Sequence, residues 1–340
     1  MVCSTCSTCS NYGGAEDSTN KTLLGWAWNG NGTAEGAGWI QFNPPSGGVG
    51  IVYPWLQTQY GSVFSQNIIR QKTAVSGANA SYCIFAQNAV KFRSANCTAG
   101  NLINTVDIQF PQSGDSGQTY NNVLGKLDVK GLSTTVKTLN GKNYNKYGNV
   151  IVSGVPDFNE PLNNQVYIVN NTLTASGATI LNGAPGQRGN GVIIVNGDLV
   201  IMGDISYATG EISGSDLKQL ASVAWIVRGD VIIDGQVQKA VGAFMILGQD
   251  DVTSPVVDLT DPDYPKYTPN HYGVFFSGAS GNPLTVYGLT VAKAFDLERS
   301  YASVLQGSEN FVYDGRLIAN PPPGLKAFLE AMPVIRDFTY

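Results

Sequence analysis

Short apolar segments separated by turn residues recur along most of the chain, and several of them repeat one another. Residues 192–205 (VIIVNGDLVIMGDI) and 224–237 (AWIVRGDVIIDGQV) align without gaps. Residues 166–180 (VYIVNNTLTASGATI) match the first of these at several positions, and a fainter copy spans 273–291. Each unit reads as a strand, a polar turn, a second strand and a glycine corner. Because one such unit cannot bury its own apolar face, the repeat predicts stacked coils around a shared apolar column.

The spacing of the copies and their lack of alternation refine this prediction. Consecutive copies are offset by 26 and 32 residues, which fits loops of different length leaving one corner, with residues 216–220 (DLKQL) as one turn of helix in the longer loop. The Val/Ile runs are nearly continuous, as is typical of parallel strands covered on both faces. We therefore predict an all-β protein in which residues 148–320 form a right-handed parallel β-solenoid, or β-helix.

The regions before the repeat show weaker patterns. Residues 1–22 read as a flexible tail rich in Cys, Ser and Thr. Residues 23–58 predict a small aromatic β-module, because two segments with period-2 alternation flank a Gly/Asn-rich turn. Residues 59–147 read as an irregular β region with a disulfide, and are candidates for the first coils of the solenoid.

The C-terminal residues 321–340 carry the one convincing helical pattern. Apolar residues recur at helical spacing between two prolines, at Leu325, Phe328, Leu329 and Met332. This pattern predicts a short amphipathic helix that caps the last coil or lies along one flank of the solenoid.

Composition supports a β-rich chain and excludes two classes of partner. Hydrophobic residues make up 43% of the chain and charged residues only 13%, with 40 glycines and 16 tyrosines. Glycine suits tight corners, and β-branched and aromatic residues suit pleated surfaces. The net charge is −5 and no basic stripe is present, so we expect no nucleic-acid partner. No apolar run approaches the ~18 residues of a membrane helix, so we expect no membrane span in this chain.

The five cysteines bear on the compartment. Cys83 and Cys97 flank a strand-like segment, and a disulfide between them would stabilise the fold by ~3 kcal/mol. It would also indicate an oxidising, extracellular location; the alternative is two unpaired thiols. Cys3, Cys6 and Cys9 lack a fourth ligand for a closed metal site and are candidates for an interchain crosslink. No export signal precedes them, which we interpret as a signal that was cleaved or replaced.

Few residues offer catalytic chemistry. Asp198, Asp204 and Asp230 each follow a glycine in a turn, where aspartates commonly bond to the backbone of their own turn. His271 is the single histidine and lies in a loop without a nucleophile motif nearby. We therefore predict no catalytic residues.

Two segments are candidate binding sites. Asp258, Asp261 and Asp263 are weak candidates for a calcium site, with a solvated acidic loop as the alternative; we expect no other cofactor. Trp26, Trp28 and Trp39 are candidates for stacking on glycans, with the core of a small β-module as the alternative.

Several motifs resemble those of uncharacterised exported surface proteins from bacteria of the candidate phyla radiation (Patescibacteria). The rungs are also similar in character to bactofilins, in architecture alone. The resemblance covers roughly residues 23–340 and implies an extracellular or cell-surface location, but no activity and no functional residues. The motifs that carry it are GWAW (25–28), GWIQFN (38–43), NPLTVYG (282–288), FDLER (295–299), FVYDGR (311–316) and NPPPG (320–324).

Three functional hypotheses follow, in this order. The first is a non-enzymatic structural protein, a subunit of a surface layer, filament or appendage that stacks on copies of itself. The second is an adhesin that binds host or environmental glycans through the aromatic N-terminal module and the solenoid loops. The third is a polysaccharide-degrading enzyme on a β-helix, which needs paired carboxylates that the sequence does not point to.

Overall fold

A computed structural model of the chain describes residues 127–210, 212, 216–260, 266–301 and 307–326, together with the backbone of short strands between Gly13 and Lys91. The chain divides into two compact units, residues 1–53 and 54–340, which are described separately below. Within the described residues no helix is both long and apolar enough to cross a bilayer.

The first unit contains a three-stranded antiparallel sheet made of β1 (Gly13–Asp17), β2 (Thr22–Asn29) and β3 (Gly38–Gln41). The β2–β3 hairpin was predicted from the alternation of large and small residues. The strand β1 was not, because its sequence, GGAED, lies in the segment that reads as a polar tail. It pairs with β2 from Gly13↔Trp26 to Asp17↔Thr22.

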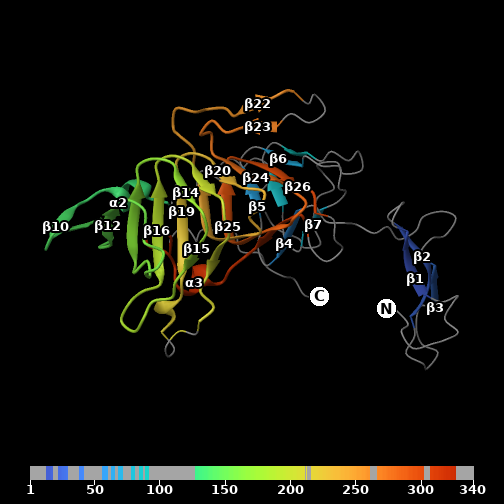
Figure 1. The fold of residues 1–340 in the computed structure, drawn as a ribbon, viewed down its shortest axis with the longest axis horizontal. Helices are drawn as coiled ribbons and strands as arrows, with labels where there is room; N and C mark the ends of the chain where they lie inside the picture. The colour runs from blue at the N-terminus through green and yellow to red at the C-terminus, as the bar shows by residue number, and fades with distance from the viewer. Residues whose placement is uncertain are drawn as a thin grey trace, which may run out of the picture. The chain divides into compact units, whose positions relative to one another are not determined.

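The second unit is mostly β-structure in two extended sheets (Figure 1). The large sheet runs in the spatial order β10 (Lys137–Leu139), β11 (Lys142–Tyr144), β12 (Val150–Ser153), β13 (Gln165–Val169), β16 (Asn190–Val195), β19 (Ser222–Val227), β21 (Lys239–Ile246), β25 (Leu284–Ala292), β27 (Glu309–Val312), β4 (Leu56–Gln59) and β7 (Ala78–Ala80), with β5 (Val63–Ser65) and β8 (Ile84–Ala86) alongside. The second sheet runs β14 (Leu173–Ala175), β17 (Leu199–Ile201), β20 (Val231–Ile233), β24 (Val274–Ser280), β26 (Ala294–Arg299), β6 (Ile68–Gln71) and β9 (Ala89–Lys91).

Smaller elements complete the described part of this unit. One corner carries the parallel pair β15 (Ala178–Ile180) and β18 (Ile205–Tyr207), and β22 (Val256–Asp258) and β23 (Lys266–Thr268) form an antiparallel hairpin. The helical elements are α2 (Val129–Ser133), the 3-10 turn η2 (Leu217–Gln219) and α3 (Arg316–Ala319). The helical turn predicted for residues 216–220 is thus confirmed.

The strands of the sequence repeat stack in parallel and in register. Ile168 pairs with Ile194, and Ile194 pairs with Ile226, at the positions that the alignment equates. In the second sheet Leu199 pairs with Val231 in the same way. The fainter fourth copy joins both sheets through β24 and β25. In the second sheet β24 pairs directly with β20 of the third copy, whereas in the large sheet β21 lies between β19 and β25.

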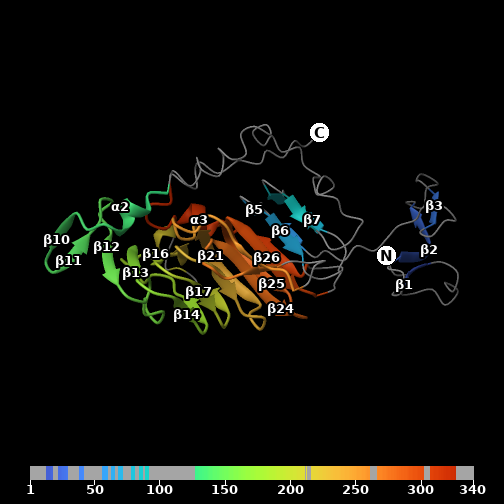
Figure 2. The same cartoon turned by 90° about the horizontal axis from the view of Figure 1, so that it is seen from above.

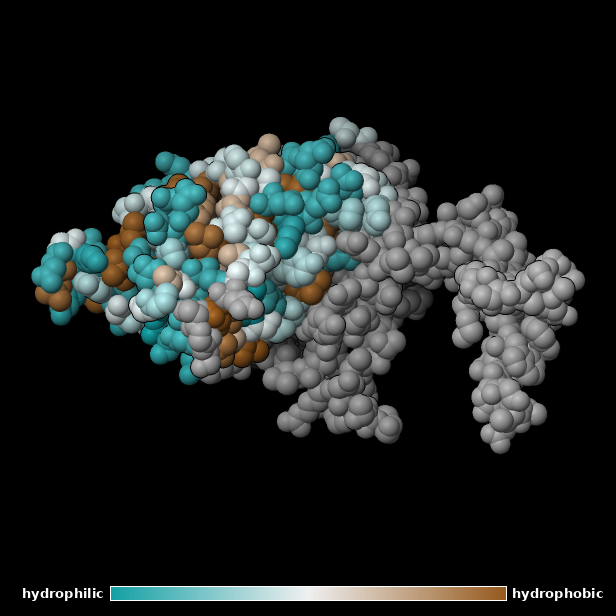
Figure 3. All heavy atoms as spheres, turned by 60° about the horizontal axis from the view of Figure 1, so that its bottom comes forward, coloured by the Kyte–Doolittle hydropathy of each residue, from teal (hydrophilic) through white to brown (hydrophobic). Residues whose placement is uncertain are grey.

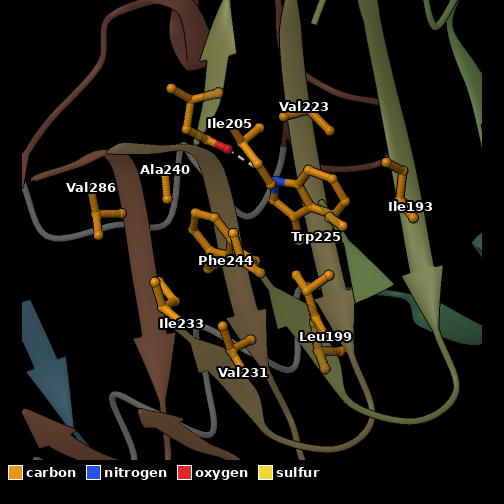
Figure 4. Close-up of a cluster of buried hydrophobic side chains, with 14 of the residues drawn as sticks. Ile193, Leu199, Ile205, Val223, Trp225, Val231, Ile233, Ala240, Phe244 and Val286 are labelled. Atoms are coloured by element: carbon orange, nitrogen blue, oxygen red, sulfur yellow. Dashed lines mark hydrogen bonds between the residues drawn. The ribbon is translucent and has the colours of Figure 1, made fainter. Parts of the chain in front are cut away.

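The central strands of the large sheet are buried on both faces, so the predicted single apolar column is two clusters. Alternate residues, including Trp225 and Phe244, point between the sheets, where their rings stack at 6.2 Å between centroids (Figure 4). The other set, including Ile194 and Ile226, packs on the outer face beneath α2, α3 and Leu325 (Figure 2). Every residue of β16 and β19 is buried as a result, which explains why the sequence there does not alternate.

The C-terminal segment is held against this outer face. Leu325 is fully buried in the outer cluster, while the predicted helix beyond Lys326 lies outside the described residues. Gly324 has a φ of +72°, and a Cβ there would lie 2.6 Å from Leu132 Cδ2, so the NPPPG motif requires its glycine. Asn320 Nδ2 donates to the carbonyl oxygens of Lys218 and Leu220 at 2.9 and 2.7 Å. The motif therefore fastens the end of the chain to the flank of the stack.

The order of the coils in space departs from their order in sequence. Strands β5 to β9 lie in the region predicted as candidate first coils and do belong to the stack, but they continue it beyond the last repeat. Strand β4, predicted as part of the aromatic module of residues 23–58, also belongs to this end of the stack. Strand β4 pairs in parallel with β27, and β6 pairs with β26. The opposite end is closed by the antiparallel hairpin β10–β11, which pairs with β12.

Candidate functional site

Three side chains that are far apart in the sequence meet at one corner of the stack: Asp198, Asp230 and His271. Asp198 and Asp230 precede β17 and β20 and occupy the same place in successive coils, because Leu199 pairs with Val231. His271 comes from the loop before β24. One ligand atom from each of Asp198, Asp230 and His271 lies within 4.8 Å of the others, and they are the one such metal-ligating group among the described residues.

The carboxylate of Asp230 is fully engaged by the backbone of the next coil. Its Oδ2 accepts hydrogen bonds from the N–H groups of Asn270 (2.9 Å) and His271 (2.7 Å). Its Oδ1 accepts from the N–H groups of Gly273 (2.8 Å) and Val274 (2.7 Å). A carboxylate has about four acceptor positions, so a metal ion at Asp230 would have to break backbone hydrogen bonds. The geometry of this residue is that of a structural brace.

Asp198 contacts both Asp230 and His271. Its Oδ1 accepts from the N–H of Asp230 at 2.8 Å and lies 2.7 Å from Nδ1 of His271. The Asp198 side chain is 14% exposed and the His271 side chain 42%. If Nδ1 carries the proton, the carboxylate holds the ring with Nε2 outward, the arrangement of a histidine base. Among the described residues, however, no hydroxyl or thiol forms a hydrogen bond with the ring.

Two local features show that this corner is tightly specified. A Cβ on Gly229 would lie 2.4 Å from Oδ1 of Asp198, which explains the glycine before the aspartate. His271 itself has a φ of +63°, a conformation that a histidine adopts only when its surroundings enforce it. The two N–H groups that Asp230 binds at Asn270 and His271 supply that enforcement.

The aspartates of the Gly-Asp turns therefore act between coils and not within them. The sequence predicted bonds to the backbone of their own turns, which is wrong for these three residues. Asp198 binds the N–H of Asp230, and Asp204 Oδ1 accepts from the N–H groups of Gln238 and Lys239 at 2.8 and 3.1 Å. The reason is the parallel register, which places each turn of one coil directly beside the corresponding turn of the next.

A second cluster of charged side chains is buried where β24, β26 and β27 approach one another. Arg299 is fully buried and donates to the carbonyl oxygens of Asp234, Gly235 and Val237 at 2.7 to 2.8 Å. Glu309 is also fully buried; its Oε1 accepts from Ser277 Oγ (2.5 Å) and from the N–H of Arg299 (3.0 Å). Its Oε2 has no hydrogen-bond partner among the described residues.

This second cluster differs electrostatically from an ordinary surface ion pair. Burial raises the pKa of Glu309 to about 7, against the opposing effects of Arg299 and Ser277. Burial also lowers the pKa of Arg299. Nearby, Asp296 Oδ2 accepts from the N–H of Tyr267 at 2.6 Å. No role was predicted for these residues from the sequence, although Asp296 and Arg299 belong to the FDLER motif, one of those that carry the resemblance.

The other predicted site residues are only partly described. Asp258 Oδ1 accepts from the N–H of Thr260 at 2.9 Å, and this bond lowers the pKa of Asp258. The rest of the predicted calcium set and all of the cysteines lie outside the described residues: Asp261, Asp263, Cys3, Cys6, Cys9, Cys83 and Cys97.

Comparison with known proteins adds two distant structural neighbours. No family model and no curated protein matches this chain. The DUF3494 domain of an ice-binding protein from Shewanella frigidimarina aligns with 77% of this chain and 95% of its own, at 10% identity and a TM-score of 0.32. An ice-binding protein from an Antarctic bacterium of the Flavobacteriaceae aligns with 78% of this chain and 47% of its own, at 13% identity and a TM-score of 0.33. TM-scores this low do not establish a common fold or activity.

Proposed function

We propose that this chain is a non-enzymatic cell-surface protein whose second unit is a right-handed β-solenoid serving as a rigid structural module. One observation carries the proposal: the ionisable side chains at the corners of the stack are used to join successive coils. Asp198, Asp204 and Asp230 accept backbone N–H groups of the next coil, and Arg299 donates to three carbonyl oxygens. Right-handed crossovers between parallel strands are the strong rule in proteins, which supports the handedness.

The nearest alternative, a polysaccharide-degrading enzyme, finds less support. Such enzymes need a pair of carboxyl groups with opposed roles facing a substrate. At the corner where Asp198, Asp230 and His271 meet, the Asp230 carboxylate is saturated by four N–H groups. The remaining exposed group is the His271 ring, held by Asp198.

Two measurements test this proposal: the release of oligosaccharides from polysaccharides, and the location of the protein on the cell. Purified protein and its His271→Ala variant are incubated with cell-wall polysaccharides, and released oligosaccharides are measured by chromatography. We expect no release from either protein, and immunogold labelling of intact producing cells should place the chain on the surface. Release by the wild type that His271→Ala abolishes would overturn the non-enzymatic function, and an exclusively internal label would overturn the location.

A second candidate function, carbohydrate binding, is favoured by the register of the first unit. Trp26 and Trp28 are two residues apart in β2, and Trp28 pairs directly with Trp39 in β3. Successive residues of a strand alternate between faces, and directly paired residues share one. The three tryptophan positions therefore lie on one face of the sheet, together with Gln41, which pairs with Trp26. Aromatic and amide positions side by side suit recognition of sugar rings.

Binding to glycans separates this candidate from the structural one. On a glycan array, the carbohydrate-binding function predicts a signal that Trp28→Ala/Trp39→Ala removes. The matched control is Trp55→Ala, which changes a tryptophan outside the three strands. A signal that survives deletion of residues 1–53, which leaves β4 in the stack, would contradict a binding face on this sheet.

A further inference from the structure

The β10–β11 hairpin, which closes one end of the stack, is exposed to solvent along its length. All residues from Thr134 to Asn143 are exposed, across both strands and the connecting turn. The turn residues Asn140 and Gly141 have φ values of 50° and 75°, as in the tight turns that match strand twist. Figure 1 shows this hairpin, with β10 outermost, at the far end of the stack from β25 and β27.

The hairpin is basic although the chain as a whole is acidic. Residues 129–156 contain Lys130, Lys137, Lys142 and Lys146 and no acidic residue, against a net charge of −5 for the whole chain. Lys146 forms an ion pair with Asp128. No ion pair neutralises the other three within the described part of the chain.

Exposed apolar side chains accompany these lysines. Val136, Leu139, Tyr147 and Val155 are 61, 47, 45 and 54% exposed. The hairpin end accordingly mixes hydrophilic and hydrophobic surface at the left of Figure 3. Exposed apolar side chains beside charged ones are common in protein–protein contacts. We call the surface formed by residues 136–147 the basic hairpin.

A second exposed segment has the opposite charge and the same mixture of side chains. Residues 249–260, here the acidic segment, contain Asp250, Asp251 and Asp258 and no basic residue. Two lysines outside this range lie near it: Lys266 pairs with Asp258 across the hairpin, and the charge of Asp250 acts on Lys293. Val256 and Leu259 in this segment are 51 and 70% exposed. The hairpin that it begins packs on the outer side of the second sheet, where Val257 contacts the cluster around Val274 (Figure 1).

We propose that the basic hairpin of one molecule docks on the acidic segment of a second copy of this chain. The inference rests on the proposed structural function, which it makes specific. Charge complementarity and the exposed apolar residues on both surfaces identify the partner as the same chain. Because the two surfaces are different, the contact is heterologous, and repetition joins molecules head to tail into a chain or ring. The hairpin also shows why copies do not simply continue the coils at this end, where the outermost strands are antiparallel.

Sedimentation velocity with a charge exchange tests the contact. The full chain is measured over a range of concentrations at low and at physiological salt. Lys137→Glu/Lys142→Glu reverses the basic hairpin, and Asp250→Lys/Asp251→Lys reverses the acidic segment. The matched control is Arg188→Glu/Lys218→Glu, which makes the same charge change as the first variant at exposed positions elsewhere on the stack.

The expected pattern is specific to this contact. The wild type and the control associate, and more weakly at higher salt, where charges are screened beyond about 10 Å. Each reversed variant alone associates at least tenfold more weakly, and an equimolar mixture of the two regains association because each supplies the surface that the other lacks. If the wild type associates but the reversed variants behave like the control, this contact is wrong and the structural function stands. If the wild type stays monomeric at all concentrations, both this contact and assembly by self-association are wrong.

Discussion

Two corners of the stack bury a carboxylate each, and they solve the same physical problem differently. At the first, Asp230 is 0% exposed and accepts four backbone N–H groups. At the second, Glu309 is also 0% exposed but accepts two hydrogen bonds through Oε1, while Oε2 has no partner among the described residues. Burying a charge is expensive unless hydrogen bonds replace those of water. The number of donors therefore separates the two carboxylates.

The difference shows how the stack uses backbone groups to hold charge. Asp230 lies beside a loop whose N–H groups converge on its carboxylate, and His271 in this loop has the left-handed conformation. Glu309 lies at a strand position, where most N–H groups are already used by neighbouring strands. Its compensation comes from Arg299, which itself is held by carbonyl oxygens of another coil. The first corner therefore holds its carboxylate with backbone donors, whereas at the second corner burial raises the pKa of Glu309.

Removing the Asp230 carboxylate should produce the largest loss of stability. Asp230→Ala leaves four N–H groups of the next loop without an acceptor, and each buried unsatisfied group costs roughly 1–3 kcal/mol. Allowing for entry of water, we expect a loss of about 4 kcal/mol in the free energy of unfolding, measured by urea denaturation. The control is Asp234→Ala, because Asp234 Oδ1 accepts from Gln236 in an exposed turn and should cost about 1 kcal/mol or less. Equal losses would show that the brace at Asp230 has no special role.

The Glu309 corner should make stability depend on pH. Its pKa in the folded protein is about 7, above the ordinary value of 4.5, so the folded state binds more protons between these values. The free energy of unfolding should then fall as pH rises from 4.5 to 7, by on the order of 3 kcal/mol from this group. Glu309→Gln should remove this slope and make the protein more stable than the wild type at pH 8. A slope that persists in Glu309→Gln must come from other groups.

The repeat allowed a large part of the stack to be predicted from the sequence. Val195 and Val227 occupy equivalent places in two copies, and they pair directly. The strand β21 was missed although its apolar residues lie in the same register, because Gly242 and Gly288 replace the Val/Ile pattern at the point where the two strands face each other. A repeat is visible only where neighbouring coils need the same side chains.

Two features could not be predicted from local sequence: the positions of the end strands, and the hydrogen-bond partners of the buried polar side chains. Strand β4 pairs with β27, some 250 residues later in the chain, and no periodicity reports a contact of that separation. The carboxylate of Asp230 accepts hydrogen bonds from N–H groups about 40 residues away, in a loop with the sequence PNHYG. Nothing in that sequence predicts a contact with Asp230. Glycine followed by aspartate indicates a turn in either case, so local sequence could not distinguish a brace within one turn from a brace between coils.

The smallest expected effect concerns the exposed half of the first corner. His271→Asn removes the imidazole that contacts Asp198 at 2.7 Å, but the side chain is 42% exposed, and polar pairs so open to water contribute 1 kcal/mol or less. Asparagine tolerates the left-handed conformation that residue 271 adopts, so the loop and its bonds to Asp230 should persist. We expect a change below about 1 kcal/mol by urea denaturation, whereas His271→Val, with a branched side chain at a φ of +63°, should cost more. If His271→Asn were as damaging as Asp230→Ala, the corner would depend on the histidine ring, and Asp198 would have to be regarded as its partner in function and not only as a brace.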